Sequence, residues 1–173
     1  METMIQSVKQ ISVPPEARSH RTLTRTGYED AFVAEVPSAG DRTAEDWMRL
    51  VLEDAPFSAR KTLRSGWFWL GLKLGPADSR SHVLGWEIRR RTPDLVLLGA
   101  ASRIGMPAEL LLERRPSSLL FCTFVRHENP IVRVAWTAIV AKPHQQVVPR
   151  LLRMAVQPSG STIPHGEAEA AVP

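Results

Sequence analysis

The sequence contains a single cysteine, Cys122, among its 173 residues. One cysteine cannot form a disulfide within the chain or supply a cysteine-based zinc site, and this usage fits a reducing compartment. Cys122 lies in the middle of an apolar run, between Phe121 and Thr123. A small buried side chain is expected there rather than a reactive thiolate, which needs an accessible and electropositive site.

Long apolar runs and a strong excess of one charge are also lacking. No stretch reaches the about 18 apolar residues of a membrane-spanning helix, and residues 1–21 contain no apolar run typical of a secretion signal. The 22 basic and 18 acidic residues leave a net charge of +4. Because Lys and Arg are scattered along the chain, no nucleic-acid-binding footprint is predicted. We therefore expect a cytoplasmic protein with no membrane span and no nucleic-acid partner.

Motifs of the common enzyme classes are absent as well. The chain has no Gly-rich phosphate loop, no HExxH, no GxSxG and no paired-carboxylate motif. No cofactor and no metal are predicted, and no residue is assigned as catalytic from the sequence.

Hydrophobic residues make up 43% of the chain, which suits one globular domain with a full core. Both ends are polar and contain prolines, so they cannot bury enough apolar surface to offset the entropy of ordering. The sequence therefore predicts a disordered or extended tail over residues 1–25, a folded domain over residues 26–156, and a disordered tail over residues 157–173.

Periodicity within the domain predicts a mixed fold. Residues 28–36 alternate as a strand does, with Asp30 as the charged exception on the apolar face. Thr43 and Pro56 are placed to begin two short helices. Four further strands are predicted, separated by short turns typical of antiparallel hairpins, at 82–89, 95–102, 108–115 and 118–126.

The last predicted element is a long helix that begins at Asn129-Pro130 and reaches about residue 155. Its apolar stripe recurs at steps of three and four residues, so one face must pack against the sheet. Pro143 and Pro149 fall inside it. A proline kink lets a helix follow a curved sheet. The alternative is two short helices, with Pro143 opening the second.

Three stretches carry a resemblance to a known superfamily: WMRLVLEDAP (47–56), GWEIRRRTPDLVLLGAASRIGMPAELLLE (85–113) and TFVRHENPIVRVAWTAIVAKPHQQVVPRLLRMA (123–155). They resemble START-like, helix-grip (SRPBCC) domains, and within these an uncharacterised bacterial family known only as a domain of unknown function. The resemblance implies an α+β helix-grip fold. In that fold a curved antiparallel sheet wraps around a long kinked C-terminal helix, and two short helices follow the first strand. Helix-grip domains often have seven strands, whereas only five are predicted here, and the family lends no catalytic motif.

Such domains imply a ligand cavity between the sheet and the C-terminal helix. The candidate wall residues are Leu84, Trp86, Leu110, Leu112, Phe121, Trp136, Val140 and His144. Because nearly all are apolar, the expected partner is a small hydrophobic or amphipathic molecule with one polar handle near His144. Two alternatives stay open. One is an enzyme of the polyketide cyclase or dehydratase kind, as some helix-grip relatives are. The other is a protein-interaction or dimerisation module with a filled core.

His144 lies close to the sheet-facing stripe of the long helix, where it could transfer a proton if a carboxylate were near. Glu87 is a possible partner, although it alternates away from Trp86 toward the opposite sheet face. His127 follows a strand, so a solvated turn is expected there. Most of the five tryptophans are expected to fill the core. Trp86 and Trp136 are the first candidates for cavity contacts.

Two apolar stretches bear on assembly. Between Leu119 and Val125 both alternating faces are apolar, so another element of the chain or a second subunit must cover the second face, and a homodimer through this strand is possible. The stretch GWFWLGLKLG (66–75) is interpreted as a buried helix end over the cavity mouth. A membrane-surface anchor is the less favoured alternative, because the stretch contains only one Lys.

Arginine clusters occur at residues 89–91 and 114–115, at the ends of predicted strands. Solvated strand ends are the expected explanation, because charge discourages edge pairing. An anionic ligand group is the alternative.

Overall fold

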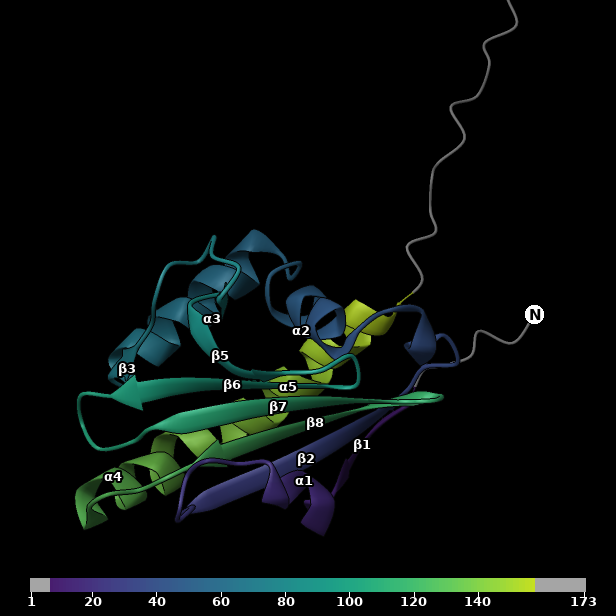
Figure 1. The fold of residues 1–173 in the computed structure, drawn as a ribbon. Helices are drawn as coiled ribbons and strands as arrows, with labels where there is room; N and C mark the ends of the chain where they lie inside the picture. Colours follow the sequence, from purple (N-terminus) through teal and green to yellow (C-terminus); the bar gives the residue numbers. More distant parts are fainter. Residues whose placement is uncertain (1–6, 158–173) are drawn as a thin grey trace, which may run out of the picture.

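The computed structural model describes residues 7–157 and shows an α+β fold. A curved, eight-stranded antiparallel sheet carries helices on its inner face, and the long C-terminal helix crosses that face (Figure 1). Apart from Gln157, the predicted C-terminal tail lies outside the described residues.

The sheet has the strand order β1-β2-β8-β7-β6-β5-β4, with β3 paired to β6. Its strands are β1 (Val8–Ile11), β2 (Tyr28–Glu35), β3 (Leu72–Lys73), β4 (His82–Val83), β5 (Trp86–Arg91), β6 (Leu95–Ser102), β7 (Ala108–Arg115) and β8 (Ser118–Val125). The predicted strands at 95–102 and 108–115 are confirmed, and the strand predicted at 118–126 ends one residue earlier. Strand β8 lies between β2 and β7, so both of its edges are paired.

The prediction of one strand over residues 82–89 is wrong. Leu84 and Gly85 both have positive φ, at 47° and 91°, and they turn the chain so that β4 pairs with β5. Two-residue hairpin turns require positive φ at such positions, and Gly or Asn normally supplies it. Leucine rarely adopts a positive φ. The sequence at Leu84 therefore gave no indication of a turn.

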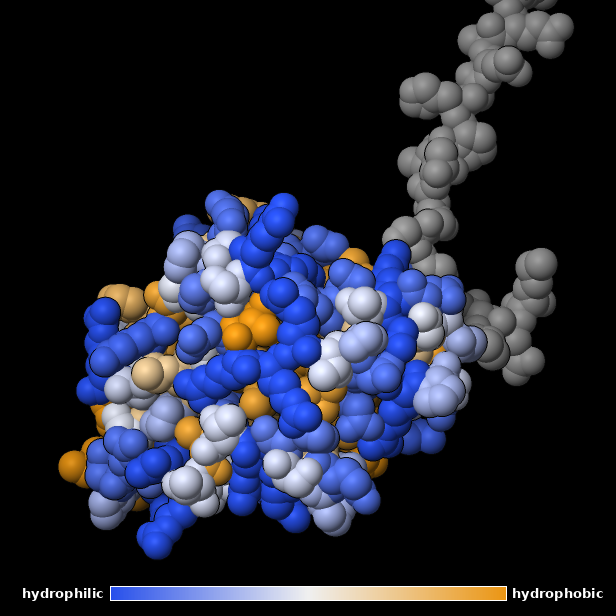
Figure 2. Space-filling view, viewed as in Figure 1, coloured by the Kyte–Doolittle hydropathy of each residue, from blue (hydrophilic) through white to orange (hydrophobic). Residues whose placement is uncertain are grey.

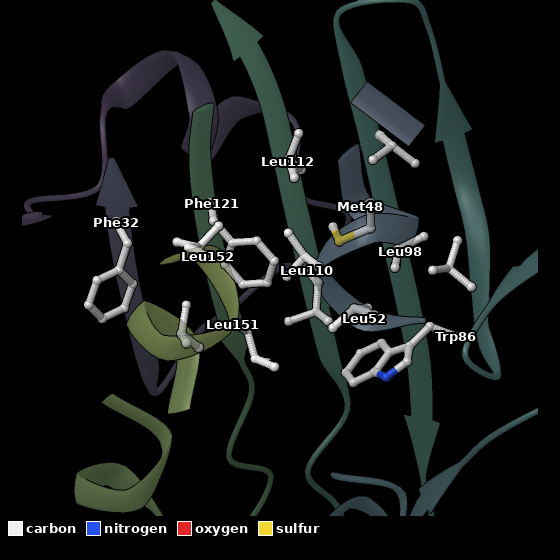
Figure 3. Packing of buried hydrophobic residues seen from close by; sticks show 14 of the residues in the cluster. Phe32, Met48, Leu52, Trp86, Leu98, Leu110, Leu112, Phe121, Leu151 and Leu152 are labelled. Carbon is white, nitrogen blue, oxygen red and sulfur yellow. The ribbon is translucent and has the colours of Figure 1, made fainter. Parts of the chain in front are cut away.

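Two helices pack on the inner face after β2: α2 (Ala44–Leu52) and α3 (Phe57–Trp69). A single 3₁₀ turn, η1 (Ala39–Asp41), precedes α2. The helix start predicted at Thr43 is confirmed, because its hydroxyl accepts from the Asp46 backbone N–H while the Asp46 carboxylate accepts from the Thr43 N–H. The inner core lies between these helices and the sheet, and Figure 3 shows its central side chains, Met48 and Leu52 of α2 among them.

The long helix is one continuous segment made of α4 (Pro130–Ala135), a π-helical turn η2 (Trp136–Val140) and α5 (Ala141–Val156). The Asn129 side chain caps it by accepting from the Val132 N–H at 2.9 Å. Pro143 is the third residue of α5, directly after the wide π turn, and Pro149 lies within α5. Neither proline separates two helices. An inserted π turn is a known way to absorb a break in the ordinary helical bonding.

Residues 8–23 are not the tail that the sequence predicts. Strand β1 pairs with β2, and helix α1 (Pro15–Ser19) crosses the outer face of the sheet. Val13 and Ala17 are buried there in a second core, with Leu23 packed against it. That core also contains the outer-face side chains of the central strands: Leu97, Leu111, Leu120, Cys122 and Phe124.

A buried carboxylate fastens this N-terminal segment to the sheet. Glu109 accepts hydrogen bonds from the backbone N–H and the hydroxyl of Thr22, and pairs with Arg89 at 2.8 Å. The second apolar face of β8 is therefore covered by an element of the same chain. Of the two alternatives for this strand, the structure shows the first, an element of the same chain, and residues 119–125 present no free face or edge for a homodimer.

Candidate functional site

A small cavity of about 50 Å³ lies between the inner face of the sheet, the C-terminal end of α3 and the η2 turn. Its wall consists of Trp67, Leu70, Leu72, Trp86, Met106, Ala108, Leu110, Thr123, Val125, Trp136, Val140 and His144. Apart from Thr123, His144 and the three indole rings of Trp67, Trp86 and Trp136, the wall is formed by aliphatic side chains and Met106. Because Trp67, Leu70 and Val140 are only half-buried, the cavity lies next to the surface.

The structure brings five of the eight predicted wall residues together at this cavity: Trp86, Leu110, Trp136, Val140 and His144. Trp136 is 5% exposed, which confirms that the long helix turns this side chain into the fold. Its ring lies 5.0 Å from that of Tyr28 and 5.8 Å from that of His144, between centroids.

The other three predicted wall residues lie elsewhere. Leu112 and Phe121 are cross-strand partners one step further along the same face, where Leu152 and Met48 fill the space (Figure 3). Leu84 lines a polar surface groove beside α2. The sequence shows which face of a strand is apolar, but not where along that face the helix leaves a gap.

The π turn aligns three side chains of the wall. The Ala141 N–H bonds to the Trp136 carbonyl, five residues back, which widens the helix at this point. With this wider turn, residues four apart along the chain lie more nearly on the same face of the helix than they do in a regular α-helix. Trp136, Val140 and His144 therefore all line the cavity. π turns are frequent at functional sites.

A polar group is buried at this cavity wall. Asp30 of β2 and Thr123 of β8 are register partners, so they lie on the same inner face. The Nε2 atom of His144 lies 3.1 Å from Thr123 Oγ1, with which it is hydrogen-bonded, and 3.1 Å from Asp30 Oδ2. Tyr28 donates its hydroxyl to the same Oδ2 at 2.6 Å. The carboxylate that His144 lacked in the sequence is therefore Asp30 and not Glu87, which is exposed on the outer side near Arg89.

The environment of Asp30 is poor in donors. The Asp30 side chain is almost wholly buried, and its Oδ1 has no hydrogen-bond partner among the described residues. Burial, the hydrogen bond to Asp30 and the charge of Asp30 all raise the pKa of Tyr28 above its ordinary value, so Tyr28 remains a protonated donor. The indole N–H groups of Trp86 and Trp136 are also buried without a partner within residues 7–157. Each unsatisfied group of this kind costs about 1–3 kcal/mol.

This arrangement can orient an imidazole. A carboxylate and a hydroxyl at Nε2 hold the His144 ring, while its Nδ1 makes no hydrogen bond to the described residues. A ring held in this way can bond a carbonyl or hydroxyl group of a ligand, or accept a proton from it. Asp30, Tyr28 and Thr123 are not among the site residues predicted from the sequence. The one available signal was Asp30, a carboxylate on the apolar face of a strand.

His127 does not lie in a solvated turn. It is half-buried, packs against Gly27, and has its ring centroid 5.9 Å from that of Trp136. Burial, and secondarily the charge of Arg133, lower the pKa of His127. Cys122 is buried as predicted, and burial raises the pKa of its thiol to about 12, so it is not a nucleophile at neutral pH.

Four of the five arginines in the two clusters are engaged in ion pairs, and the fifth, Arg90, contacts His20 Nδ1 at 3.0 Å. Arg91 pairs with Glu45 at 2.5 Å, and Arg115 with Glu113 at 3.0 Å. Arg114 pairs with Asp94, and Arg89 with the buried Glu109. The polar groove beside α2, about 620 Å³ in volume, is larger than the cavity. Its charges are largely neutralised by each other, since Arg49 pairs with both Glu45 and Glu53.

Within residues 7–157, no three His, Cys, Asp or Glu side chains are grouped as a metal site would require. None of the described helices is long and apolar enough to cross a membrane. Comparisons of the chain with protein-family models, with curated proteins and with solved structures found no match.

Proposed function

We propose that this protein binds a small, mainly apolar or amphipathic molecule between the sheet and the C-terminal helix, in the manner of a helix-grip domain. The observation that carries the proposal is His144, a polar residue of an otherwise mainly apolar cavity wall, whose imidazole is held by the buried Asp30 carboxyl group. Ligand pockets are mostly apolar, with a few polar groups that fix orientation. The indole N–H groups of Trp86 and Trp136, which both belong to the wall and lack a partner among the described residues, are polar atoms that a ligand could satisfy.

The size of the cavity sets a condition on the ligand. Pockets for drug-sized molecules span roughly 300–1,000 Å³, so a cavity of about 50 Å³ admits such a molecule only if the wall moves. Helix α3 is the wall element suited to move, because none of its residues is buried. It ends at Trp69, and Gly71 shortly after it has a φ of +72°, which favours glycine and permits a sharp change of direction. The proposed ligand therefore enters by displacing α3 from the mouth of the cavity.

A matched pair of alanines tests the proposal. Ala108 lines the cavity, whereas Ala100, its register partner on β6, is buried in the same core away from it. Ala108→Val fills the cavity, while Ala100→Val adds the same volume elsewhere. Native mass spectrometry of freshly purified protein, and quenching of tryptophan emission by a polycyclic probe, report binding. We expect the wild type and the Ala100→Val variant to bind, and the Ala108→Val variant to stay folded without binding. Equal binding by the two variants would place the ligand elsewhere.

The Asp30–His144 pair also favours a second function, an enzyme of the polyketide cyclase or dehydratase kind. In a dehydration, Nδ1 of His144 would remove the proton next to a carbonyl. The bond to the β-hydroxyl would then break, and the hydroxide would leave as water after taking up a proton, so no oxidant is needed. A β-hydroxy thioester incubated with the protein should lose one water by mass spectrometry. Under this function His144→Gln and Asp30→Asn abolish the loss while the probe still binds. If the thioester binds but loses no water, the enzyme function is refuted and only the binding function remains.

A further inference from the structure

We infer that the end of the molecule around the cavity mouth is a docking surface for an anionic lipid bilayer. The docking surface is formed by three segments, 64–75, 101–107 and 126–142, which meet at the left end of the molecule in Figure 1. This inference rests on exposed side chains and charge, and is independent of what the cavity binds.

Large apolar side chains are exposed on each of the three segments. On α3, Phe68 is 65% and Trp69 82% exposed. On the helix that begins at Asn129, Ile131 is 81% and Ile139 70% exposed. Val134 and Ile104 are exposed as well. The interpretation of residues 66–75 as a buried helix end is therefore wrong for Phe68 and Trp69, whose neighbours Trp67 and Leu70 face the cavity instead.

Close contacts show that the three segments form one surface. The Arg103 N–H bonds to the Gly71 carbonyl at 2.8 Å, which joins the end of α3 to the β6–β7 loop. In that loop the Gly105 carbonyl accepts from the Glu128 N–H at 2.9 Å, which joins it to the start of α4. Across the mouth, Trp67 and Leu70 share the cavity with Val140 of η2. In the view of Figure 2, hydrophobic atoms reach the surface along this end between blue, hydrophilic side chains.

The charge of the same segments identifies the occupant. They contain six basic residues and one acidic residue, Glu128, although the whole chain has a net charge of only +4. The basic residues are Arg64, Lys73, Arg103, Arg126, Arg133 and Lys142. Of these only Arg126 has an acidic partner among the described residues, and that contact to Glu128 is long, at 3.7 Å. Exposed apolar side chains ringed by Lys and Arg are suited to the interface of an anionic membrane, where a Trp ring sits at headgroup level.

A second copy of the chain is the poorer occupant. Two such surfaces placed face to face would bring six basic residues of each copy together with only Glu128 of each copy to offset them, and like-charge contacts oppose association. Residues 66–75 contain only one Lys, because most of the basic residues of the docking surface are supplied by segments far away in the sequence.

Co-sedimentation of the full chain with vesicles tests the inference. Vesicles of phosphatidylcholine mixed with phosphatidylglycerol should bind the protein, vesicles of phosphatidylcholine alone should bind it weakly, and added salt should reduce binding. We expect Trp69→Ser to weaken binding at least about tenfold, through lost apolar burial. Neutralisation by Arg133→Gln should weaken it about fivefold, as one basic residue near an anionic surface does.

Matched control variants distinguish binding through the docking surface from non-specific adsorption to vesicles. Phe57, at the other end of α3, is 73% exposed, so Phe57→Ser is the control for Phe68→Ser. Arg153, exposed near the end of α5, provides Arg153→Gln as the control for Arg133→Gln. Only the variants of the docking surface should lose binding. The inference is overturned if the wild type ignores anionic vesicles, or if control and surface variants lose binding equally. It is also overturned if sedimentation velocity shows a dimer that Trp69→Ser dissociates.

Discussion

Replacing the buried Asp30–His144 pair by leucines tests whether this polar group serves function rather than stability. The Asp30 carboxylate has one clear donor besides His144, the Tyr28 hydroxyl, and one oxygen without a partner among the described residues. His144→Leu thus leaves the buried Asp30 carboxyl group with a single hydrogen bond. Breaking a buried pair in this way costs about 3–5 kcal/mol. We expect the lower end, about 3 kcal/mol, because the His144 side chain is 18% exposed and water can partly replace it.

The double variant Asp30→Leu/His144→Leu should recover most of this loss. Replacing a buried ion pair by apolar residues of similar volume is often neutral or stabilising. We therefore expect the free energy of unfolding to return to within about 1 kcal/mol of the wild type, a coupling energy of about 2–3 kcal/mol between the two positions. A ligand that uses the pair as its polar handle should no longer bind, although the fold is intact.

Urea unfolding at neutral pH, followed by tryptophan emission, measures each variant of this cycle. A loss of about 3 kcal/mol corresponds to a fall in Tm of roughly 6–12 °C for a domain of this size. The surface pair Arg115–Glu113, whose side chains are 36% and 23% exposed, is the control, for which the same cycle should give a coupling of only about 0–1 kcal/mol. The reasoning is refuted if the double variant loses as much stability as the two single variants combined. The pair would then hold the fold together and would need no ligand to explain it.

Three further outcomes follow from the structure. Arg89→Met should lower the free energy of unfolding by about 3–5 kcal/mol in urea, because the fully buried Glu109 loses its charged partner; a loss below about 1 kcal/mol would show that the Thr22 donors suffice. Trp136→Ala should cost about 3–5 kcal/mol by the same measurement, and an unchanged urea midpoint would contradict its place in the core. The pKa of His127 is lowered in the folded chain. Once the pH falls below about 6.5, the unfolded chain therefore binds more protons at this residue than the folded chain does, and the free energy of unfolding should decline from there toward acid pH. His127→Phe should reduce this fall of Tm at acid pH, because both ring nitrogens lack hydrogen-bond partners within residues 7–157 and phenylalanine can replace the ring. If Tm depends on pH in the same way in the variant and the wild type, the decline is due to other groups.

Part of the site could be predicted from sequence because it depends on local rules. Alternation and turn signals located the strands β6 and β7 at their observed bounds, and the caps at Thr43 and Asn129 located two helix starts. The apolar stripe of the long helix also identified Trp136, Val140 and His144 as facing the sheet, since residues three and four apart share a helix face.

The tertiary structure alone decided how distant segments meet. Asp30 and His144 are far apart in the chain, and only the register of β2 on β8 and the π turn bring the carboxylate to the imidazole. The N-terminal segment carries no periodicity of its own, and it is ordered by the apolar face that it covers and by Glu109. The sequence by itself determined the elements and their apolar faces, because capping, turns and periodicity act within a few residues. The cavity, the Asp30–His144 pair and the docking surface depend on packing between distant segments. The free energy of that packing depends on several segments at once, so it cannot be estimated from any one of them.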